Sequence, residues 1–185
     1  TGVQTCALPI CAAIVTVEDN VDPSLTTQDI TIQLDGSGNA SITPSDVTDA
    51  TADNCGTPTV TVDQTTFDCT EVGVNTVNVT VTDASGNAVT TTANVTVEDD
   101  TPPTATCADF AVGLDGSGNA SITPADIDAG STDNCGIASM TVSPNSFTSA
   151  DLGTVTVTLT VTDVNGNVST CTADVTINDA NPPNA

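Results

Sequence analysis

Residues 75–98 read NTVNVTVTDASGNAVTTTANVTVE, and this stretch decides the fold class. Val recurs at every second position in 77–81, and β-branched residues dominate on both sides of the segment ASGN at 84–87. Alternation with period two places apolar side chains on one face of a strand, and Gly next to Asn favours a tight hairpin turn. The stretch therefore predicts a long antiparallel hairpin with one buried face.

Shorter runs of the same kind lie at 30–34, 39–43 and 59–63. Between the first two, DGSG at 35–38 predicts a turn that joins them as a hairpin. Next, TPSD at 43–46 predicts one capped helical turn with Pro at its first position. Aromatic residues make up only 2% of the chain, so Val, Ile, Leu and Ala must supply the core. Many short strands separated by Gly, Asn and Asp turns indicate a β-sandwich.

The sequence also repeats itself without a gap. LDGSGNASITP at 34–44 recurs at 114–124, an offset of 80 residues, and DNCG at 53–56 recurs with the same offset at 133–136. A fixed period indicates tandem copies of one structural unit. We therefore predict an all-β protein made of two tandem immunoglobulin-like β-sandwich repeats of 80 residues.

The period sets the expected boundaries. The closing-strand motif VTVED at 95–99 already occurs at 15–19, which predicts that a truncated repeat precedes the first complete one. The first ten residues, TGVQTCALPI, resemble a translated sequencing adaptor and are left out of the fold prediction. The expected organisation is an artefact at 1–10, a last strand at 11–19, repeat 1 at 20–99, repeat 2 at 100–179 and the start of a linker at 180–185.

The charge balance excludes whole classes of partner. The chain has 24 acidic residues, no Lys, Arg or His, and a formal net charge of −24. Nucleic-acid binding depends on cationic side chains that displace counterions, and attachment to anionic membranes needs basic residues as well. No apolar window is long enough to span a bilayer. We predict neither nucleic-acid binding nor direct membrane insertion.

A combination of motifs in repeat 2 resembles the hyalin repeat (HYR) family. Pro103 and Cys107 are followed by DNCG at 133–136, VTDVNGN at 161–167 and Cys171. The family is an immunoglobulin-like extracellular module, and the Thr- and Val-rich style without Lys is similar to tandem versions in bacterial surface adhesins of the Bacteroidetes type. The resemblance covers residues 11–185 and implies adhesion or structural spacing without catalysis.

The two copies also differ at paired cysteine positions. Repeat 1 has Thr27 and Thr91 where repeat 2 has Cys107 and Cys171. The joint loss predicts a Cys107–Cys171 disulfide in repeat 2 and puts the equivalent bond of the family pattern in doubt for repeat 1.

The remaining cysteines are assigned in the same way. Cys55 and Cys69 are both present in repeat 1 and are predicted to bond. Cys135 has Ser149 at the equivalent place and is predicted to be a free thiol, as is Cys11, whose partner would lie in the truncated repeat. Disulfides indicate an extracellular location. The alternative is reduced thiols in the core, and a zinc site is disfavoured because the chain has no CxxC motif and no His.

The carboxylates gather at the expected junctions between repeats. In an immunoglobulin-like topology, the loop between the last two strands and the DNCG loop lie at the end that faces the preceding repeat. Hard oxygen ligands that converge on a linker suit calcium, the one cofactor we consider. The alternative is that these side chains only cap turns. The candidate ligands are Glu18, Asp19, Asp22, Asp53, Asp83, Glu98, Asp99, Asp100, Asp133, Asp163 and Asn165.

These observations favour a non-catalytic structural or adhesive spacer of a large secreted or cell-surface protein. Its partners would be neighbouring repeats and an unidentified surface or matrix ligand. The alternative is a carbohydrate-binding accessory module of a secreted hydrolase, although the chain has no Trp or Tyr to stack on sugars. An enzyme is the least favoured class, because most acid–base and nucleophilic arrangements need side chains that this sequence lacks.

Overall fold

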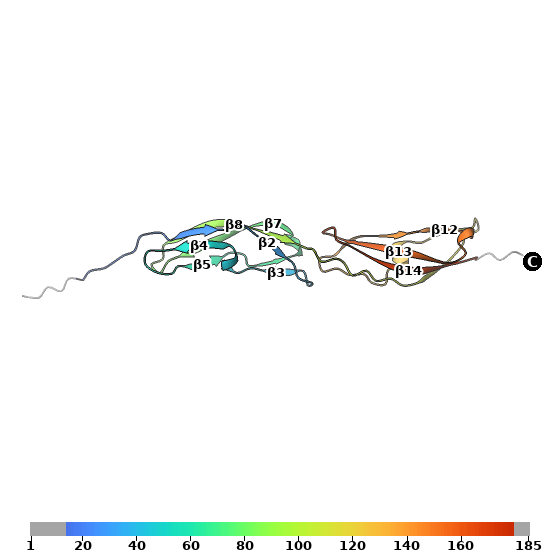
Figure 1. The fold of residues 1–185 in the computed structure, drawn as a ribbon, viewed down its shortest axis with the longest axis horizontal. Helices are drawn as coiled ribbons and strands as arrows, with labels where there is room; N and C mark the ends of the chain where they lie inside the picture. The colour runs from blue at the N-terminus through green and yellow to red at the C-terminus, as the bar shows by residue number, and fades with distance from the viewer. Residues whose placement is uncertain (1–13, 180–185) are drawn as a thin grey trace, which may run out of the picture.

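A computed structural model describes residues 14–179, which form two β-sandwich units placed end to end (Figure 1). We call residues 20–99 repeat 1 and residues 100–179 repeat 2. The chain passes from one unit to the next once, so the described part is an elongated rod. No helix among these residues is long and apolar enough to cross a bilayer.

The predicted hairpin is the centre of repeat 1. Strands β7 (Gly73–Thr82) and β8 (Ala88–Glu98) pair antiparallel, with Val77 opposite Ala93. Strand β5 (Thr59–Val62) pairs antiparallel with the outer edge of β7, and β2 (Ile30–Gln33) pairs parallel with β8. The resulting sheet has the order β2-β8-β7-β5.

Two short strand pairs and two helical turns complete repeat 1. Strand β1 pairs with β4, and β3 pairs with β6, all antiparallel. Both helical turns are short 3-10 helices, η1 and η2, and the first is the capped turn expected after Thr43. The bounds are β1 Ser24–Thr27, β3 Asn39–Ser41, η1 Pro44–Asp46, β4 Thr48–Ala52, β6 Thr66–Asp68 and η2 Cys69–Glu71.

Repeat 2 reproduces this plan with local differences. Its main sheet has the order β11-β13-β14-β9, and β10 pairs with β12. The β1–β4 pair of repeat 1 is reduced to the isolated bridges Thr104↔Thr132 and Cys107↔Asp128. The bounds are β9 Phe110–Gly113, β10 Asn119–Ser121, α1 Pro124–Ile127, β11 Ile137–Ser143, β12 Ser146–Thr148, η3 Ser149–Asp151, β13 Gly153–Asp163 and β14 Val168–Asn178.

Each repeat has its own aliphatic core. Val77, Val79 and Val95 are fully buried in repeat 1, and Val157, Leu159 and Val175 are their counterparts in repeat 2. Burial alternates with exposure along both long hairpins, as the period-two pattern predicts. The all-β, two-sandwich fold class is therefore confirmed.

One local prediction was wrong. The turn at 35–38 forms, with the amide of Asp35 donating to the Asn39 carbonyl at 2.8 Å, but the segments on its two sides enter different strand pairs, β2–β8 and β3–β6. Short strands pair where their apolar face can be buried. Here β2 buries its apolar face in the main sheet and β3 buries its own in the separate β3–β6 pair.

Residues 14–19, the described part of the predicted last strand at 11–19, lie outside the described strands. In repeat 1 the equivalent segment of β8 is held between β7 and β2, whereas no described strand lies beside residues 14–19. As a result Val15 is 81% exposed, while its counterpart Val95 is 0% exposed.

The capped turns generate a prediction about pH. The Thr123 amide donates to Asp126 Oδ2 at 2.7 Å and its hydroxyl at 2.8 Å, and these bonds lower the pKa of Asp126 below its ordinary value. A depressed folded pKa contributes stability that is complete above the unfolded Asp pKa of about 3.9 and is lost as pH falls through the folded value.

We therefore expect Asp126→Ala to be less stable than the parent chain in urea titrations at pH 6, with the difference shrinking below about pH 4. A stability difference that is constant from pH 6 to strongly acidic conditions would contradict the role assigned to the Asp126 carboxylate.

Candidate functional site at the junctions between repeats

The junction between the two repeats is formed by the segment that follows β8. Asp99 is buried directly after this strand, and Pro103 is buried four residues later. The side-chain amide of Asn167, in the loop between β13 and β14, donates to the Asp99 carbonyl at 2.8 Å. The hairpin loop of repeat 2 therefore lies at the end that faces repeat 1, as the sequence predicts.

Three carboxylates meet at this junction. Asp99, Asp133 and Asp163 each offer an oxygen, and these oxygens all lie within 4.8 Å of one another. They come from the end of β8, from the DNCG loop and from the end of β13. We call these three residues the junction trio.

The same arrangement occurs one period earlier. Asp19, Asp53 and Asp83 also bring their oxygens within 4.8 Å of one another. The Asn87 side chain donates to the Asp19 carbonyl at 3.0 Å, in the same way that Asn167 contacts Asp99. We call these residues the upstream trio. Because the same arrangement occurs at equivalent positions of both repeats, we conclude that it is a repeated feature of the fold.

Backbone amides fix the loops that carry the trio. Asp163 Oδ1 accepts from the amides of Asn165 and Asn167 at 2.9 and 2.8 Å. Asp133 Oδ2 accepts from the amides of Cys135 and Gly136 at 2.8 and 2.9 Å. These side chains therefore cap their turns, and the capping leaves one oxygen of Asp133 free of these bonds.

Asn134 was missed by the sequence analysis as a junction residue. Its side-chain amide donates to Asp99 Oδ1 at 3.2 Å and to the Asp35 carbonyl of repeat 1, also at 3.2 Å. One signal was available, because the residue recurs as Asn54, whose amide reaches Asp19 Oδ1 at 3.4 Å.

The other predicted ligands lie outside the two trios. Successive side chains of an extended segment point in opposite directions, so Glu98 points away from the side on which Asp99 is buried. The Glu98 carboxylate accepts from the Gln33 side chain at 2.7 Å. Asn165 contributes its backbone amide to Asp163 and has an exposed side chain. Glu18, Asp22, Glu98 and Asp100 are exposed and belong to neither trio.

The electrostatics of the trios are unfavourable by themselves. Two unit charges 4.8 Å apart repel by roughly 3 kcal/mol at an effective dielectric constant of about 20. Burial raises the pKa of Asp83, but hydrogen bonds from Asn87, Gly86 and Ser85 outweigh it, and the pKa of this carboxyl is lowered overall. The local hydrogen bonds thus favour the charged form of Asp83 inside an already acidic cluster.

One predicted disulfide is present and the other is wrong. Cys107 and Cys171 are bonded within repeat 2. Cys69 is bonded to Cys135, with 5.3 Å between their Cα atoms, and Cys55 is an exposed free thiol. Cys135 is therefore not free, and the Cys55–Cys69 bond does not form. Cys11 lies outside the described residues.

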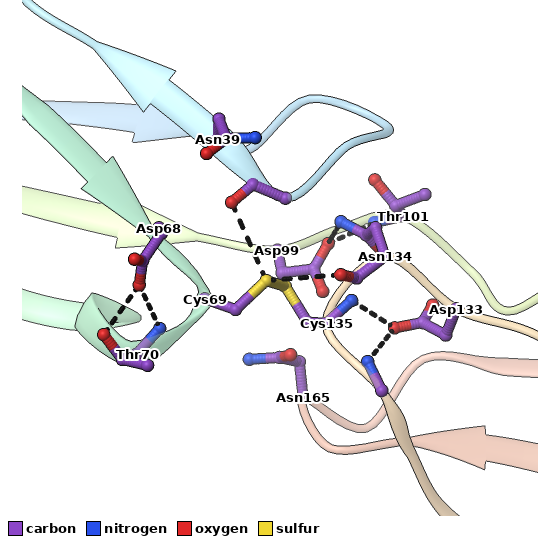
Figure 2. The surroundings of a disulfide bond; sticks show 12 residues. Asn39, Asp68, Cys69, Thr70, Asp99, Thr101, Asp133, Asn134, Cys135 and Asn165 are labelled. Carbon is purple, nitrogen blue, oxygen red and sulfur yellow. Dashed lines mark hydrogen bonds between the residues drawn. A yellow bond between two sulfur atoms is a disulfide. The ribbon is translucent and has the colours of Figure 1, made fainter.

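The physical reason is the position of each cysteine along the rod. Cys55 lies beside the upstream trio, where a hydrogen bond with Asp19, burial and the neighbouring carboxylates raise the pKa of its thiol. Cys69 lies at the opposite end of repeat 1, against the DNCG loop of repeat 2 (Figure 2). The disulfide thus joins consecutive repeats.

Gly38 is required where the repeats meet. A Cβ atom at this position would lie 2.6 Å from the Cys69 sulfur and 3.0 Å from the Asn134 carbonyl oxygen. Its counterpart Gly118 has a similar positive φ but no atom within 4 Å of such a Cβ. The close approach therefore arises from the junction and not from the turn.

Comparisons with known proteins find partial structural similarity at low TM-scores and no family. No family model matches the chain, and no curated protein matches it. Among solved structures, it is similar to human mucin-like protocadherin EC1-2 (TM-score 0.44, 14% identity, covering 85% of this chain and 98% of that one). It is also similar to the four N-terminal Ig domains of Dscam1 isoform 8.4 (TM-score 0.43, 11% identity, covering 89% of this chain and 48% of that one). A third similar structure is that of the fibronectin(III)-like modules of Clostridium thermocellum CbhA (TM-score 0.33, 11% identity, covering 88% of this chain and 97% of that one).

The disulfide pattern is directly testable by peptide mapping of the non-reduced chain. We expect a peptide that joins Cys69 to Cys135, and alkylation of Cys55 without prior reduction. The thiolate is the form that reacts, so the raised pKa should make Cys55 react slowly near neutrality and faster as pH increases. A Cys55–Cys69 peptide would contradict the junction geometry.

Gly38 provides a second test, with Gly118 as its matched control. Alanine at either position forces a residue with a Cβ into positive φ, at a cost of about 1–2 kcal/mol. Only Gly38→Ala should add a clash with Cys69 and Asn134. We expect a larger loss of unfolding free energy for Gly38→Ala than for Gly118→Ala in denaturant titrations, and equal losses would show that the junction tolerates the extra atom.

Proposed function

We propose that this chain is a non-catalytic spacer of an extracellular surface protein, in which repeats are locked end to end into a stiff rod. The observation that carries the proposal is the Cys69–Cys135 bond, which joins two units that each have their own core. A covalent bond beside a single chain crossing gives the junction between repeat 1 and repeat 2 two covalent connections. Two connections resist rotation of one repeat against the next, whereas one permits it.

Non-covalent contacts support the same role. Asn134 of repeat 2 donates to the Asp35 carbonyl of repeat 1, and Asn167 holds the carbonyl of Asp99. The connection itself is short and contains Pro102 and Pro103, the second of which is buried. Short Pro-containing connections favour extended, semi-rigid arrangements. Setting the distance between a surface and a terminal domain requires this kind of stiffness.

The proposal extends to neighbouring repeats of the same type. Cys55 is the counterpart of Cys135 and lies at the equivalent end of repeat 1. A preceding repeat with a cysteine at the position of Cys69 would be joined to it in the same way.

The carbohydrate-binding alternative has less support. Sugar recognition commonly uses exposed aromatic rings, and two of the three Phe residues, Phe67 and Phe147, are only 2% exposed. The third, Phe110, is half-buried in β9. No described residue therefore offers an exposed aromatic platform.

The spacer role is tested by breaking the junction bond. Cys135→Ser should leave both sandwiches folded by circular dichroism, and should broaden the distribution of interdomain distances measured by small-angle X-ray scattering. The control is the pair Cys107→Ser and Cys171→Ser, which opens a loop closed over a sequence separation of 64.

This control should destabilise repeat 2 by about 4 kcal/mol and leave the interdomain distances of the folded chain unchanged. Scattering by Cys135→Ser that is identical to that of the parent chain would show that the bond does not set the stiffness of the rod.

A further inference from the structure

Buried carboxylate oxygens without a donor mark the two trios. Asp99 is only 5% exposed, and its Oδ2 is buried with no hydrogen-bond partner among the described residues. Asp133 Oδ1 is in the same state in the junction trio. Asp19 Oδ2 and Asp53 Oδ1 repeat the pattern in the upstream trio. Buried polar atoms are nearly always satisfied, so recurrence at equivalent positions calls for an explanation.

The partnered oxygens show why the free ones face one another. Asp99 Oδ1 accepts from the Thr101 amide at 3.1 Å and from Asn134, while Asp133 Oδ2 accepts from two amides of its own loop. The segment at Asp99 and the DNCG loop thus each use one oxygen to fix the carboxylate and leave the second to the cluster. Asp163, 1% exposed, closes the group from the opposite hairpin, and its Oδ2 accepts from the Asn167 side chain at 2.8 Å.

No side chain of this protein can neutralise these groups, because the sequence contains no Lys, Arg or His. Three carboxylates within 4.8 Å carry a formal charge of −3 when ionised. Buried charges are stable when they are paired or bind metal ions. An external cation is therefore the partner that fits.

The ligand chemistry selects the ion. Carboxylate oxygens from three separate segments, without His or a thiolate, suit a hard cation and not zinc. Calcium accepts irregular shells of 6–8 oxygens at about 2.3–2.6 Å. Two oxygens on one calcium are then at most about 5 Å apart, and the trios satisfy this limit. Magnesium demands a near-ideal octahedron and keeps most of its water, which suits it less to a site with three carboxylates.

We propose that the junction trio (Asp99, Asp133 and Asp163) and the upstream trio (Asp19, Asp53 and Asp83) each bind one calcium ion. In each trio the ion would connect the linker that enters the repeat to the DNCG loop and to the end of the long hairpin strand of that repeat. This proposal deepens the proposed spacer role, and it rests on that role only for the consequence that a bound ion stiffens the junction. In the junction trio, calcium and the Cys69–Cys135 bond act on the same loop, since Asp133 and Cys135 are two residues apart.

The test uses the full chain, freed of metal with a chelator and titrated with calcium chloride by isothermal calorimetry. We expect two saturable sites, and a melting temperature several degrees higher in calcium than in chelator, because a ligand that binds only the folded state stabilises it. Magnesium at equal ionic strength should give a much smaller shift. Two calcium sites with this shift support the proposal, and no saturable binding overturns it.

Variants separate a built site from diffuse attraction to an acidic protein. Asp133→Asn and Asp53→Asn should each remove one of the two sites. Asp100→Asn is the matched control, since it removes the same charge one residue from Asp99 at an exposed position outside the trio, and it should keep both sites. Equal loss of binding in Asp100→Asn and Asp133→Asn would overturn the proposal in favour of diffuse attraction.

A stability crossover checks that the variants remain folded. In chelator, Asp133→Asn should be at least as stable as the parent chain, because it removes like-charge repulsion. In calcium the order should reverse, and a variant less stable in both conditions by the same amount would count against the site.

Scattering separates this proposal from the spacer role. An extended chain without calcium binding overturns the ion sites alone, whereas calcium binding to a chain with freely rotating repeats overturns the spacer role alone.

Discussion

The constraint on which this structure depends is that its carboxylates have no cationic side chain to pair with. All 24 acidic residues occur in a chain without Lys, Arg or His, so backbone amides must take the place of salt bridges. Asp35 shows the solution, because its Oδ1 accepts from the amides of Ser37 and Asn39 at 2.8 and 3.0 Å. Asp83, Asp115 and Asp163 repeat this turn with the same spacing.

This constraint also shapes the ends of the repeats. Each repeat buries a core of Val, Ile and Leu with few aromatic residues, and such a small core leaves limited stability in reserve. The connection between repeats must therefore be secured by other means. A disulfide, side-chain amides from Asn134 and Asn167, and inward-facing carboxylates meet at one place. The junction thus brings covalent and electrostatic interactions together in one place.

Local features were predictable because they depend on short stretches of chain. The alternation of Val along β7 and β13 identified the long hairpins, and Pro after Thr43 and Thr123 identified the capped turns. The period predicted where the acidic motifs recur, and the immunoglobulin-like topology predicted that Asp133 and Asp163 lie at the end of repeat 2 that faces repeat 1. Glu98 and Asp100 lie outside the trios, because sequence proximity does not reveal which side chains turn inward.

The sequence by itself determined the strand pattern, the 80-residue period between 34 and 114, the turn chemistry and the acidic character of the junctions. These follow from side-chain periodicity and from hydrogen bonds over a few residues. Only the tertiary structure decided that β2 runs parallel to β8, and that Cys69 bonds to Cys135 across a separation of 66 residues and not to Cys55. A disulfide forms between sulfur atoms that the folded chain brings together, and here that proximity depends on how one repeat is seated on the next.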